Sequence, residues 1–392
     1  MPEAAAAHAG GSGRSAFADA LRGFALVGIC VVNLPWLAWP TSYPPPGFSS
    51  PDAAARLLAA VFFEGKFFPL FSFLFGFGFA RQLERARAGG AAEAASYARR
   101  LAGLFVLGAL HAVLLFVGDI LATYALLGAA LWAVRGWPDA RLLALARGCV
   151  GAAALAYALL AWGGAGGGGT AEAAAAEAAS ARRAYLGGFA EALAQRVSDL
   201  PAAAAVVFLF NWPLAFAGFC AGLVAGRRGL LDDPARLAAA MPPVALLAAG
   251  AVAGNLGAAA APWLPAGWGA ATAGALLAVG GPCLSALYVL ALARAWRSPP
   301  ARARLEAWLA PAGRMSLSNY LGQSVVANLL FAGWGFGLYG SLGLAALLPL
   351  ALAIAAALLA LSVLWLRRFG TGPAERLLRA WSRGGRRGGT HG

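Results

Sequence analysis

Residues 342–366 read LGLAALLPLALAIAAALLALSVLWL, a run of 25 residues without a charged side chain. About 20 helical residues cross the hydrocarbon core of a bilayer, so a run of this length predicts a transmembrane helix. Arg367 and Arg368 follow it directly, and such positive charges mark the cytoplasmic end of a span. The run therefore predicts an all-α integral membrane protein.

Nine further apolar runs precede this segment, separated by stretches rich in Arg, Pro or Gly. The ten predicted spans lie near residues 16–39, 60–80, 101–117, 119–135, 141–162, 202–226, 241–262, 268–293, 316–334 and 342–366. Gly118 and Asp119 predict a tight turn between the third span and the fourth. With 61% hydrophobic and 12% charged residues, and a mean hydropathy of +0.70, the chain lacks the polar surface of a soluble globular domain.

The basic residues predict the orientation of the bundle. A net charge of +14 does not indicate nucleic-acid binding here, because the arginines lie between apolar runs and not on one soluble face. If the N-terminus lies in the cytoplasm, 25 of the 30 Lys and Arg residues fall on the cytoplasmic side. Merging the third and fourth spans would invert every later loop and destroy this asymmetry. We therefore expect ten spans, both termini in the cytoplasm, and the lipid bilayer as a partner.

Polar composition marks the regions outside the spans. Residues 1–15 are predicted to form a disordered tail before a transmembrane bundle at 16–366, and residues 367–392 a basic cytoplasmic tail. An external segment at 163–200 begins with a glycine-rich linker and continues with sequence of high helix propensity. Apolar side chains at helical spacing predict an amphipathic helix on the outer surface: Tyr185, Phe189, Leu193, Val197 and Leu200.

All four cysteines, Cys30, Cys149, Cys220 and Cys283, lie inside apolar runs. None has the CxxC spacing or the neighbouring histidine of a metal site, so we expect buried small hydrophobic residues and no metal cofactor. The sequence also contains no phosphate-binding loop, no HExxH and no GxSxG motif.

Charged side chains inside spans are candidate functional groups, because each costs about 2.5–3.5 kcal/mol or more at mid-bilayer. At the inner end of the first span, Asp19 and Arg22 stand three residues apart and can pair on one helix face that also carries Asn33. The pair is either an interfacial ion pair or a site at which Arg22 meets an anionic nucleotide or pyrophosphate group.

Near the outer end of the second span, Glu64 and Lys66 precede the aromatic run FFPLFSFLFGFGF. Lys66 is the only lysine in a chain that otherwise uses arginine, which favours a role for a compact ammonium group. The alternative is an anchor that snorkels to the membrane surface. Pro35, Pro69 and Pro213 are candidates for helix breaks.

His111, near the outer end of the third span, is the only histidine away from the two tails. Its imidazole is suited to exchanging a proton near neutral pH, and Asp119 in the next turn can orient it or act alone as an acid or base. The alternative is a structural hydrogen-bond donor.

The ninth span carries a polar stripe that follows Arg314. Its members at helical spacing are Ser316, Asn319, Tyr320, Gln323, Ser324 and Asn328. Such groups either bond to neighbouring helices, at about 1 kcal/mol per contact, or line a polar cavity. Six groups on one stripe favour a cavity wall. The candidate substrate or cofactor contacts are Asp19, Arg22, Lys66, Arg314, Ser316, Asn319, Tyr320 and Gln323.

Several ordered stretches resemble the YeiB family of bacterial membrane proteins, also called domain of unknown function 418. They are ALRGFALVGICVVN (20–33), FFEGKFFPLFSFLFGFGFA (62–80), GLFVLGALHAVLLFVGDILATYALLG (103–128), AGRMSLSNYLGQSVV (312–326) and SVLWLRRFGTGPAERLLR (362–379). The resemblance covers nearly the whole chain except 163–200. It implies a multi-pass protein of the bacterial inner membrane.

The first span is also similar to the opening of the heparan-glucosaminide acetyltransferase relatives, which move acetyl groups from cytosolic acetyl-CoA to an acceptor on the far side. This similarity implies that Arg22 lies near CoA and Asn33 near the reacting centre. Those relatives carry a histidine shortly after that asparagine, whereas this chain reads YPPP at 43–46. In this chain only His111 could replace it.

Three functions stay open. The first is a membrane acyltransferase that takes an acyl group from cytosolic acyl-CoA to an outward-facing hydroxyl or amine of a small molecule, glycan or lipid. His111, aided by Asp119 or Glu64, would be the base, and Asn33 or Lys66 would stabilise the oxyanion. The second is a transporter or proton-coupled permease in which the same charged groups form a relay. The third is a scaffold that acts through the external helix. A homo-oligomer is compatible with all three.

Overall fold

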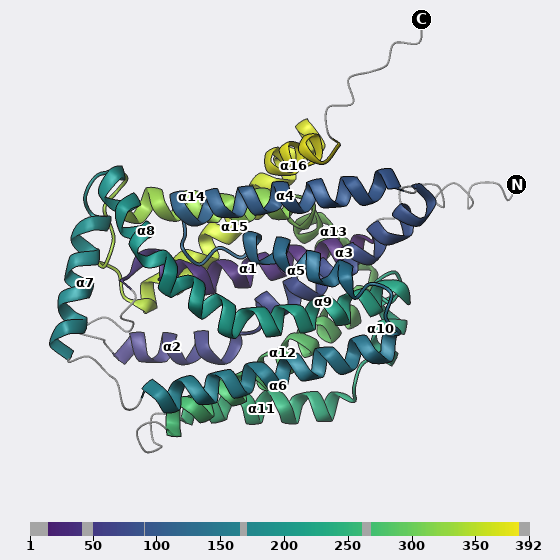
Figure 1. Cartoon of the computed structure of the whole chain (residues 1–392), viewed down its shortest axis with the longest axis horizontal. Coiled ribbons are helices and arrows are strands. Elements are labelled where there is room, and N and C mark those ends of the chain that lie inside the picture. Colours follow the sequence, from purple (N-terminus) through teal and green to yellow (C-terminus); the bar gives the residue numbers. More distant parts are fainter. Residues whose placement is uncertain (1–14, 41–49, 90, 165–170, 261–267, 384–392) are drawn as a thin grey trace, which may run out of the picture.

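The computed structural model describes residues 15–40, 50–89, 91–164, 171–260 and 268–383. Within these residues every regular element is a helix, and most helices run along the long axis of the molecule (Figure 1). The all-helical class expected from hydropathy is therefore confirmed. The predicted tail at 1–14 and most of the glycine-rich linker, at 165–170, lie outside the described residues.

The helices follow one another closely along the chain. They are α1 (Ala16–Ala38), α2 (Ser50–Phe62), α3 (Phe67–Gly89), α4 (Ala91–Leu114), α5 (Leu121–Ala133), α6 (Asp139–Gly164), α7 (Ala171–Tyr185), α8 (Phe189–Val206), a π-helical turn (Val207–Asn211), α9 (Trp212–Arg227), α10 (Pro234–Ala240), α11 (Val244–Ala260), α12 (Trp268–Trp296), α13 (Pro299–Arg314), α14 (Ser316–Phe331), α15 (Leu344–Phe369) and α16 (Pro373–Arg383).

Seven helical segments in the described part of the chain are long and apolar enough to cross a membrane, or eight if α10 and α11, bent by 70°, count as one span. The fourth, sixth and ninth predicted spans form short helices. α5 has 13 residues, and α9 and α14 have 16 each, which at 1.5 Å per residue gives about 20 and 24 Å. The membrane class is supported, while the count of ten and the cytoplasmic location of both termini stay predictions.

The second predicted span, 60–80, is divided by a turn between α2 and α3. Gly65 in this turn has φ of 76°, a left-handed conformation that glycine adopts without steric cost. Pro69 lies in the first turn of α3, where backbone N–H groups have no intrahelical acceptor, so the N–H group that proline lacks costs the helix no hydrogen bond. The break predicted near Pro69 is therefore confirmed, and it places Lys66 at the junction of the two helices.

The other two prolines behave differently. Pro213 lies at the start of α9, directly after the π-helical turn, so a helix irregularity is confirmed there. α1 continues past Pro35 to Ala38, so the break predicted at Pro35 is wrong. Pro35 lies close enough to the end of α1 for the helix to accommodate it.

The segment predicted to be external, 163–200, forms two helices, and the second belongs to a stretch, Phe189–Leu209, that is long and apolar enough to cross a membrane. α7 crosses the ends of the other helices at one end of the molecule, and α8 turns back along the bundle after a break at Leu186–Gly188 (Figure 1). The predicted apolar stripe does not face inward, because Phe189 and Val197 are exposed while Ala192 and Arg196 are buried. A hydrogen bond from Arg196 to α14 orients α8 this way.

Small residues allow the central helices to approach one another. A side chain at Gly222 of α9 would meet the backbone of Phe73 and Phe77 in α3. Around this contact, the rings of Phe75 and Phe219 stack with centroids 4.5 Å apart. The aromatic run of α3 therefore packs against α9 through both backbone proximity and ring stacking.

The described part of the predicted cytoplasmic tail is helical. Glu375 of α16 accepts hydrogen bonds from the backbone N–H groups of Leu317, at 2.7 Å, and Ser318, at 3.2 Å. The hydroxyl of Ser318 bonds to the same carboxylate at 2.5 Å. Because the first N–H groups of a helix lack intrahelical partners, Glu375 caps α14.

The cysteines are free thiols. Cys30 and Cys220 are buried, as predicted, whereas Cys149 and Cys283 are partly exposed. The described residues contain no group of three or more metal-ligating side chains close enough to hold a metal ion.

Candidate functional site

The turn between α4 and α5 brings two predicted residues together. His111 lies in the last turn of α4, and Asp119 lies two residues before α5. One carboxylate oxygen of Asp119, Oδ2, accepts from the backbone N–H of Ala122 at 2.9 Å, which fixes the turn to the start of α5. The other oxygen, Oδ1, lies 2.8 Å from Nδ1 of His111, so of the two roles left open for Asp119 this geometry favours the one in which it orients the histidine.

The second ring nitrogen of His111 meets a hydroxyl on another helix. Nε2 lies 2.9 Å from Oγ of Ser324 in the middle of α14. A carboxylate at Nδ1 favours the tautomer with its proton on that nitrogen, which leaves Nε2 to accept from the Ser324 hydroxyl. The relative exposures of His111, Asp119 and Ser324 are 2%, 6% and 2%. Acid, imidazole and hydroxyl thus form a buried chain in the order of a nucleophilic triad.

Aromatic side chains enclose this triad. The ring of Tyr320 lies 5.0 Å from that of His111, and Phe116 approaches edge-on at 6.2 Å. The hydroxyl of Tyr320 accepts from the backbone N–H of Ile120 at 3.3 Å. These groups limit the access of water and fix the turn that carries Asp119.

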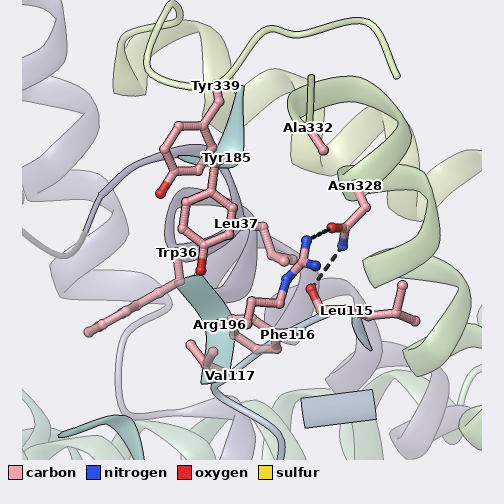
Figure 2. Close-up of a pocket in the computed structure, with 10 residues that line it drawn as sticks. All are labelled: Trp36, Leu37, Leu115, Phe116, Val117, Tyr185, Arg196, Asn328, Ala332 and Tyr339. Carbon is pink, nitrogen blue, oxygen red and sulfur yellow. Dashed lines mark hydrogen bonds between the residues drawn. The ribbon is translucent and has the colours of Figure 1, made fainter. Parts of the chain in front are cut away.

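One turn beyond Ser324, Asn328 connects α14 to two other elements. Its amide nitrogen donates to the carbonyl of Leu115 at 2.9 Å and to that of Ser324 at 2.8 Å. Its oxygen accepts from the guanidinium of Arg196, as Figure 2 shows. Arg196 and Asn328 line a small cavity together with side chains from α1, α7 and the α4–α5 turn.

The rest of the polar stripe does not face a common cavity. Asn319 donates to the carbonyl of Ala312 at 3.2 Å and to the hydroxyl of Ser362 at 2.8 Å. Gln323 donates to the carbonyl of Leu26 at 2.9 Å. The members of the stripe therefore contact different elements, namely α13, α15, α1 and the α4–α5 region. The prediction that they line one cavity wall is wrong. Ser316 is half-buried at the start of α14.

Asp19 and Arg22, at the start of α1, form a separate set of contacts. Arg22 donates to Asp19 at 2.6 Å, and its guanidinium lies beside Gly78 of α3. The predicted pairing is confirmed. Asn33, further along α1, is half-buried. Arg314 is exposed and donates to the carbonyl of Gly370 at 3.4 Å.

Lys66 is fully enclosed, with a relative exposure of 0%. Its ammonium donates to the carbonyl of Ala60 at 2.5 Å, and its own carbonyl accepts from Ser285 at 2.5 Å. A snorkelling anchor is therefore wrong for Lys66, because no part of the side chain reaches the surface. Glu64, in the same turn, is half-buried.

A second cavity, of about 380 Å³, lies at the end of the bundle predicted to face the cytoplasm. Arg135 and Arg227 line it together with Trp137 and Glu84. Arg227 also pairs with Asp139 at 3.1 Å, so the cavity carries both signs of charge.

These features define a helical membrane protein with a buried Ser–His–Asp chain. A family model described as a protein of unknown function, DUF418, matches residues 225–385. The uncharacterized protein YxaH of Bacillus subtilis (strain 168) is 32% identical over 382 residues, 92% of each chain. An uncharacterized 39.9 kDa protein from the amylase 3' region of Bacillus acidopullulyticus is 40% identical over 110 residues, 28% of this chain and 31% of that protein. No solved structure matches. The chain belongs to the DUF418 (YeiB) family, which confirms the resemblance found in the sequence.

Proposed function

We propose that this protein is a membrane-embedded acyltransferase in which Ser324 is the nucleophile, His111 the general base and Asp119 the group that orients and stabilises the imidazole. The observation that supports this proposal is the buried hydrogen-bonded order Asp119–His111–Ser324. A serine hydroxyl is a weak nucleophile until an adjacent base takes its proton, and this geometry supplies that base.

The proposed reaction has two halves. In the first, Oγ of Ser324 bonds to the carbonyl carbon of an acyl thioester while Nε2 of His111 takes the hydroxyl proton. The carbon–sulfur bond breaks, and the proton passes to the leaving thiolate. In the second, the acceptor hydroxyl or amine attacks the acyl-serine, His111 takes its proton, and that proton returns to Ser324. Asp119 stabilises the transient imidazolium in both halves.

The donor, proposed from the similarity of the first span to the heparan-glucosaminide acetyltransferase relatives, is acyl-CoA, which would arrive from the cytoplasm in a bacterial inner membrane. The cavity lined by Arg135 and Arg227 offers its phosphates cationic partners on the predicted cytoplasmic side. The acceptor would approach from the outer face. Lys66 and Glu64 have no step in this mechanism, because the described contacts of Lys66 join it to α2 and α12.

The experiment is acyl labelling of the detergent-purified full chain with isotopically labelled acetyl-CoA, followed by mass spectrometry. Label is expected on the peptide that contains Ser324 and is expected to disappear in Ser324→Ala. Ser362→Ala is the matched control, because Ser362 is an equally buried serine that bonds to Asn319. Absence of acetyl-CoA binding, or equal labelling in Ser324→Ala, would contradict the proposal.

Transport is the second candidate, favoured by the fully buried Lys66 at the turn that divides α2 from α3. Charged groups at broken helices commonly bind ions or substrates in transporters. Reconstituted vesicles would then show solute-dependent uptake or a change of internal pH that Glu64→Gln abolishes and Ser324→Ala leaves intact. Flux that is equal in empty vesicles would exclude this candidate.

A further inference from the structure

Arg196 carries a buried donor that points to a ligand. The side chain is 3% exposed, and one guanidinium nitrogen, Nη2, bonds to Asn328. The other, Nη1, is also buried but has no hydrogen-bond partner among the described residues. Leaving a charged donor unsatisfied costs more than leaving a neutral one, so an unpaired buried guanidinium nitrogen requires an explanation.

No direct ion pair is described for Arg196. Asp199 lies one turn along α8, but no carboxylate of the described residues lies within ion-pair distance of Arg196. The two oxygens of Asp199 instead accept from Tyr185, at 3.0 Å, and Gln195, at 2.8 Å. The ring of Tyr185 lies 5.5 Å from the guanidinium carbon and supplies a cation–π contact.

The hydrogen bond between Tyr185 and Asp199, beside Arg196, persists because the Tyr185 phenol keeps its proton. Burial, and then the Asp199 carboxylate, raise the pKa of the Tyr185 phenol. The phenol therefore stays protonated and donates to Asp199, which holds that carboxylate away from Arg196. Tyr185 also stacks on Tyr339, with ring centroids 4.7 Å apart, and the two rings form one side of the cavity (Figure 2).

The cavity beside Arg196 has an opening and a limited size. Trp36 at its rim is 59% exposed, so the cavity reaches the molecular surface. Its volume is about 20 Å³, room for one or two water-sized groups. The lining is otherwise aromatic and aliphatic, apart from Arg196 and Asn328 (Figure 2). A small planar anion matches this space and the unpaired edge of the guanidinium better than a bulky one.

We propose that Arg196 binds the carboxylate of a small organic acid in this cavity. Asn328 holds the guanidinium in place through its oxygen, and its nitrogen bonds to the carbonyl of Ser324. The bound carboxylate would therefore lie about one helical turn from the Ser324 residue. If the proposed acyltransferase function holds, on which this last step rests, the acid is the acyl acceptor, and its carboxylate sets the distance of its hydroxyl or amine from the acyl-serine.

The test measures carboxylate binding without turnover. Acetate and glycolate are added to the full chain in an uncharged detergent, with chloride at equal ionic strength as the reference and inorganic phosphate as the competing anion. Binding is read by saturation-transfer NMR of the methyl or methylene protons, and by the shift in thermal unfolding. Wild type is expected to bind both carboxylates, to unfold at a higher temperature with them, and to show no such shift with phosphate.

Three variants identify the group responsible. Arg196→Gln is expected to lose the NMR signal and the thermal shift, and Arg196→Lys to retain only part of both, because an ammonium lacks the planar fork. Arg183→Gln, at an exposed arginine on α7, is expected to bind as wild type does. If Arg196→Gln does not fold, the Arg196→Lys result decides the point, and wild-type affinity in that variant overturns the proposal.

The remaining outcomes separate this site from the proposed function. No carboxylate signal in wild type, an equal signal in Arg196→Gln, or a larger thermal shift with phosphate each overturns the carboxylate site. Ser324→Ala is expected to bind acetate normally. Carboxylate binding at Arg196 without acylation of Ser324 would support the carboxylate site and refute the acyltransferase. Acylation of Ser324 without carboxylate binding would support the acyltransferase and refute the carboxylate site.

Discussion

Oγ of Ser324 lies 2.9 Å from Nε2 of His111, although 213 positions separate these residues in the chain. The two groups satisfy each other in a region where both side chains are almost fully buried. The contact joins α14 to the end of α4, and the carboxylate of Asp119 completes it from the following turn. A single hydrogen-bonded chain thus serves both helix packing and the proposed chemistry.

Asp119→Asn separates these two roles. Its amide oxygen can still accept from Ala122, so the start of α5 is retained. The amide nitrogen then donates to Nδ1 of His111, which leaves the ring proton on Nε2 and removes the base for Ser324, and the negative charge that stabilises the imidazolium is lost. We expect turnover of acetyl-CoA to fall by about 10⁴-fold, with acyl-CoA binding and helix content unchanged. Glu306→Gln, at an exposed ion pair with Arg302 on α13, is the control and should keep wild-type turnover. A kcat for Asp119→Asn within a few-fold of wild type would refute the assigned role.

Asn328→Ala is expected to destabilise the fold. The change removes the acceptor for Arg196 and the donor to two backbone carbonyls, so the free energy of unfolding should fall by about 1–3 kcal/mol. Asn328→Asp retains an acceptor opposite Arg196 but turns an oxygen that cannot donate toward the carbonyls of Leu115 and Ser324, so it should also destabilise the fold. The measurement is the midpoint of denaturation in mixed detergent micelles.

Asn255→Ala provides the comparison for that series. Asn255 is also buried, but its shorter hydrogen bond, 2.6 Å, goes to Ala251 on its own helix. Its only bond to another element is a long one of 3.5 Å to Gly280 of α12, so its loss should cost less than the loss of Asn328, which bonds to Arg196 and to Leu115 at shorter range. Equal costs at the two positions would show that the link to Arg196 contributes nothing to stability.

The sequence predicted the parts of the site that are close along the chain. His111 and Asp119 are eight residues apart, and Gly118 predicts the turn between them, so the sequence places the two residues near each other but leaves the contact of their side chains open. The pairing of His111 with Ser324 depends on how α14 packs against α4. Spacing along α14 placed Ser324 on a polar stripe but could not indicate which neighbouring helix each member would face.

Arg196 shows a different limit of the sequence. The sequence places its charge among the external basic residues, and the apolar stripe through Phe189 and Val197 predicts an amphipathic helix that packs this stripe against the bundle or lipid. In the structure, the polar side of α8 turns inward because Asn328 supplies an acceptor there. The position of Arg196 along α8 cannot reveal an acceptor on a distant helix, so the burial of Arg196 could be found only from the fold.

Gly222→Leu tests the close packing of α9 on α3. A side chain at this position would overlap the backbone of Phe73 and Phe77, which cannot move away as a flexible side chain can. Overpacking of this kind costs about 1–3 kcal/mol or more, so we expect a lower denaturation midpoint and less monodisperse protein on size exclusion. Gly148→Leu is the control, because a Cβ there meets nothing within 4 Å. Similar behaviour of the two variants would show that the α3–α9 contact is looser than described.

Glu375→Ala tests whether α16 holds the start of α14, and hence the helix that carries Ser324. The carboxylate accepts from two backbone N–H groups and one hydroxyl in the first turn of α14, and no other acceptor is described for the N–H groups of Leu317 and Ser318. Loss of a helix cap costs about 0.5–2 kcal/mol, so the midpoint of denaturation should fall and hydrogen exchange at these two amides should accelerate. Glu306→Ala removes a carboxylate that bonds only to Arg302 on the exposed face of α13, where an ion pair contributes about 0.3–0.5 kcal/mol, and should leave that exchange unchanged. If exchange at Leu317 and Ser318 stays slow in Glu375→Ala, the order of α14 does not depend on α16, and the C-terminal helix could be removed without disturbing Ser324.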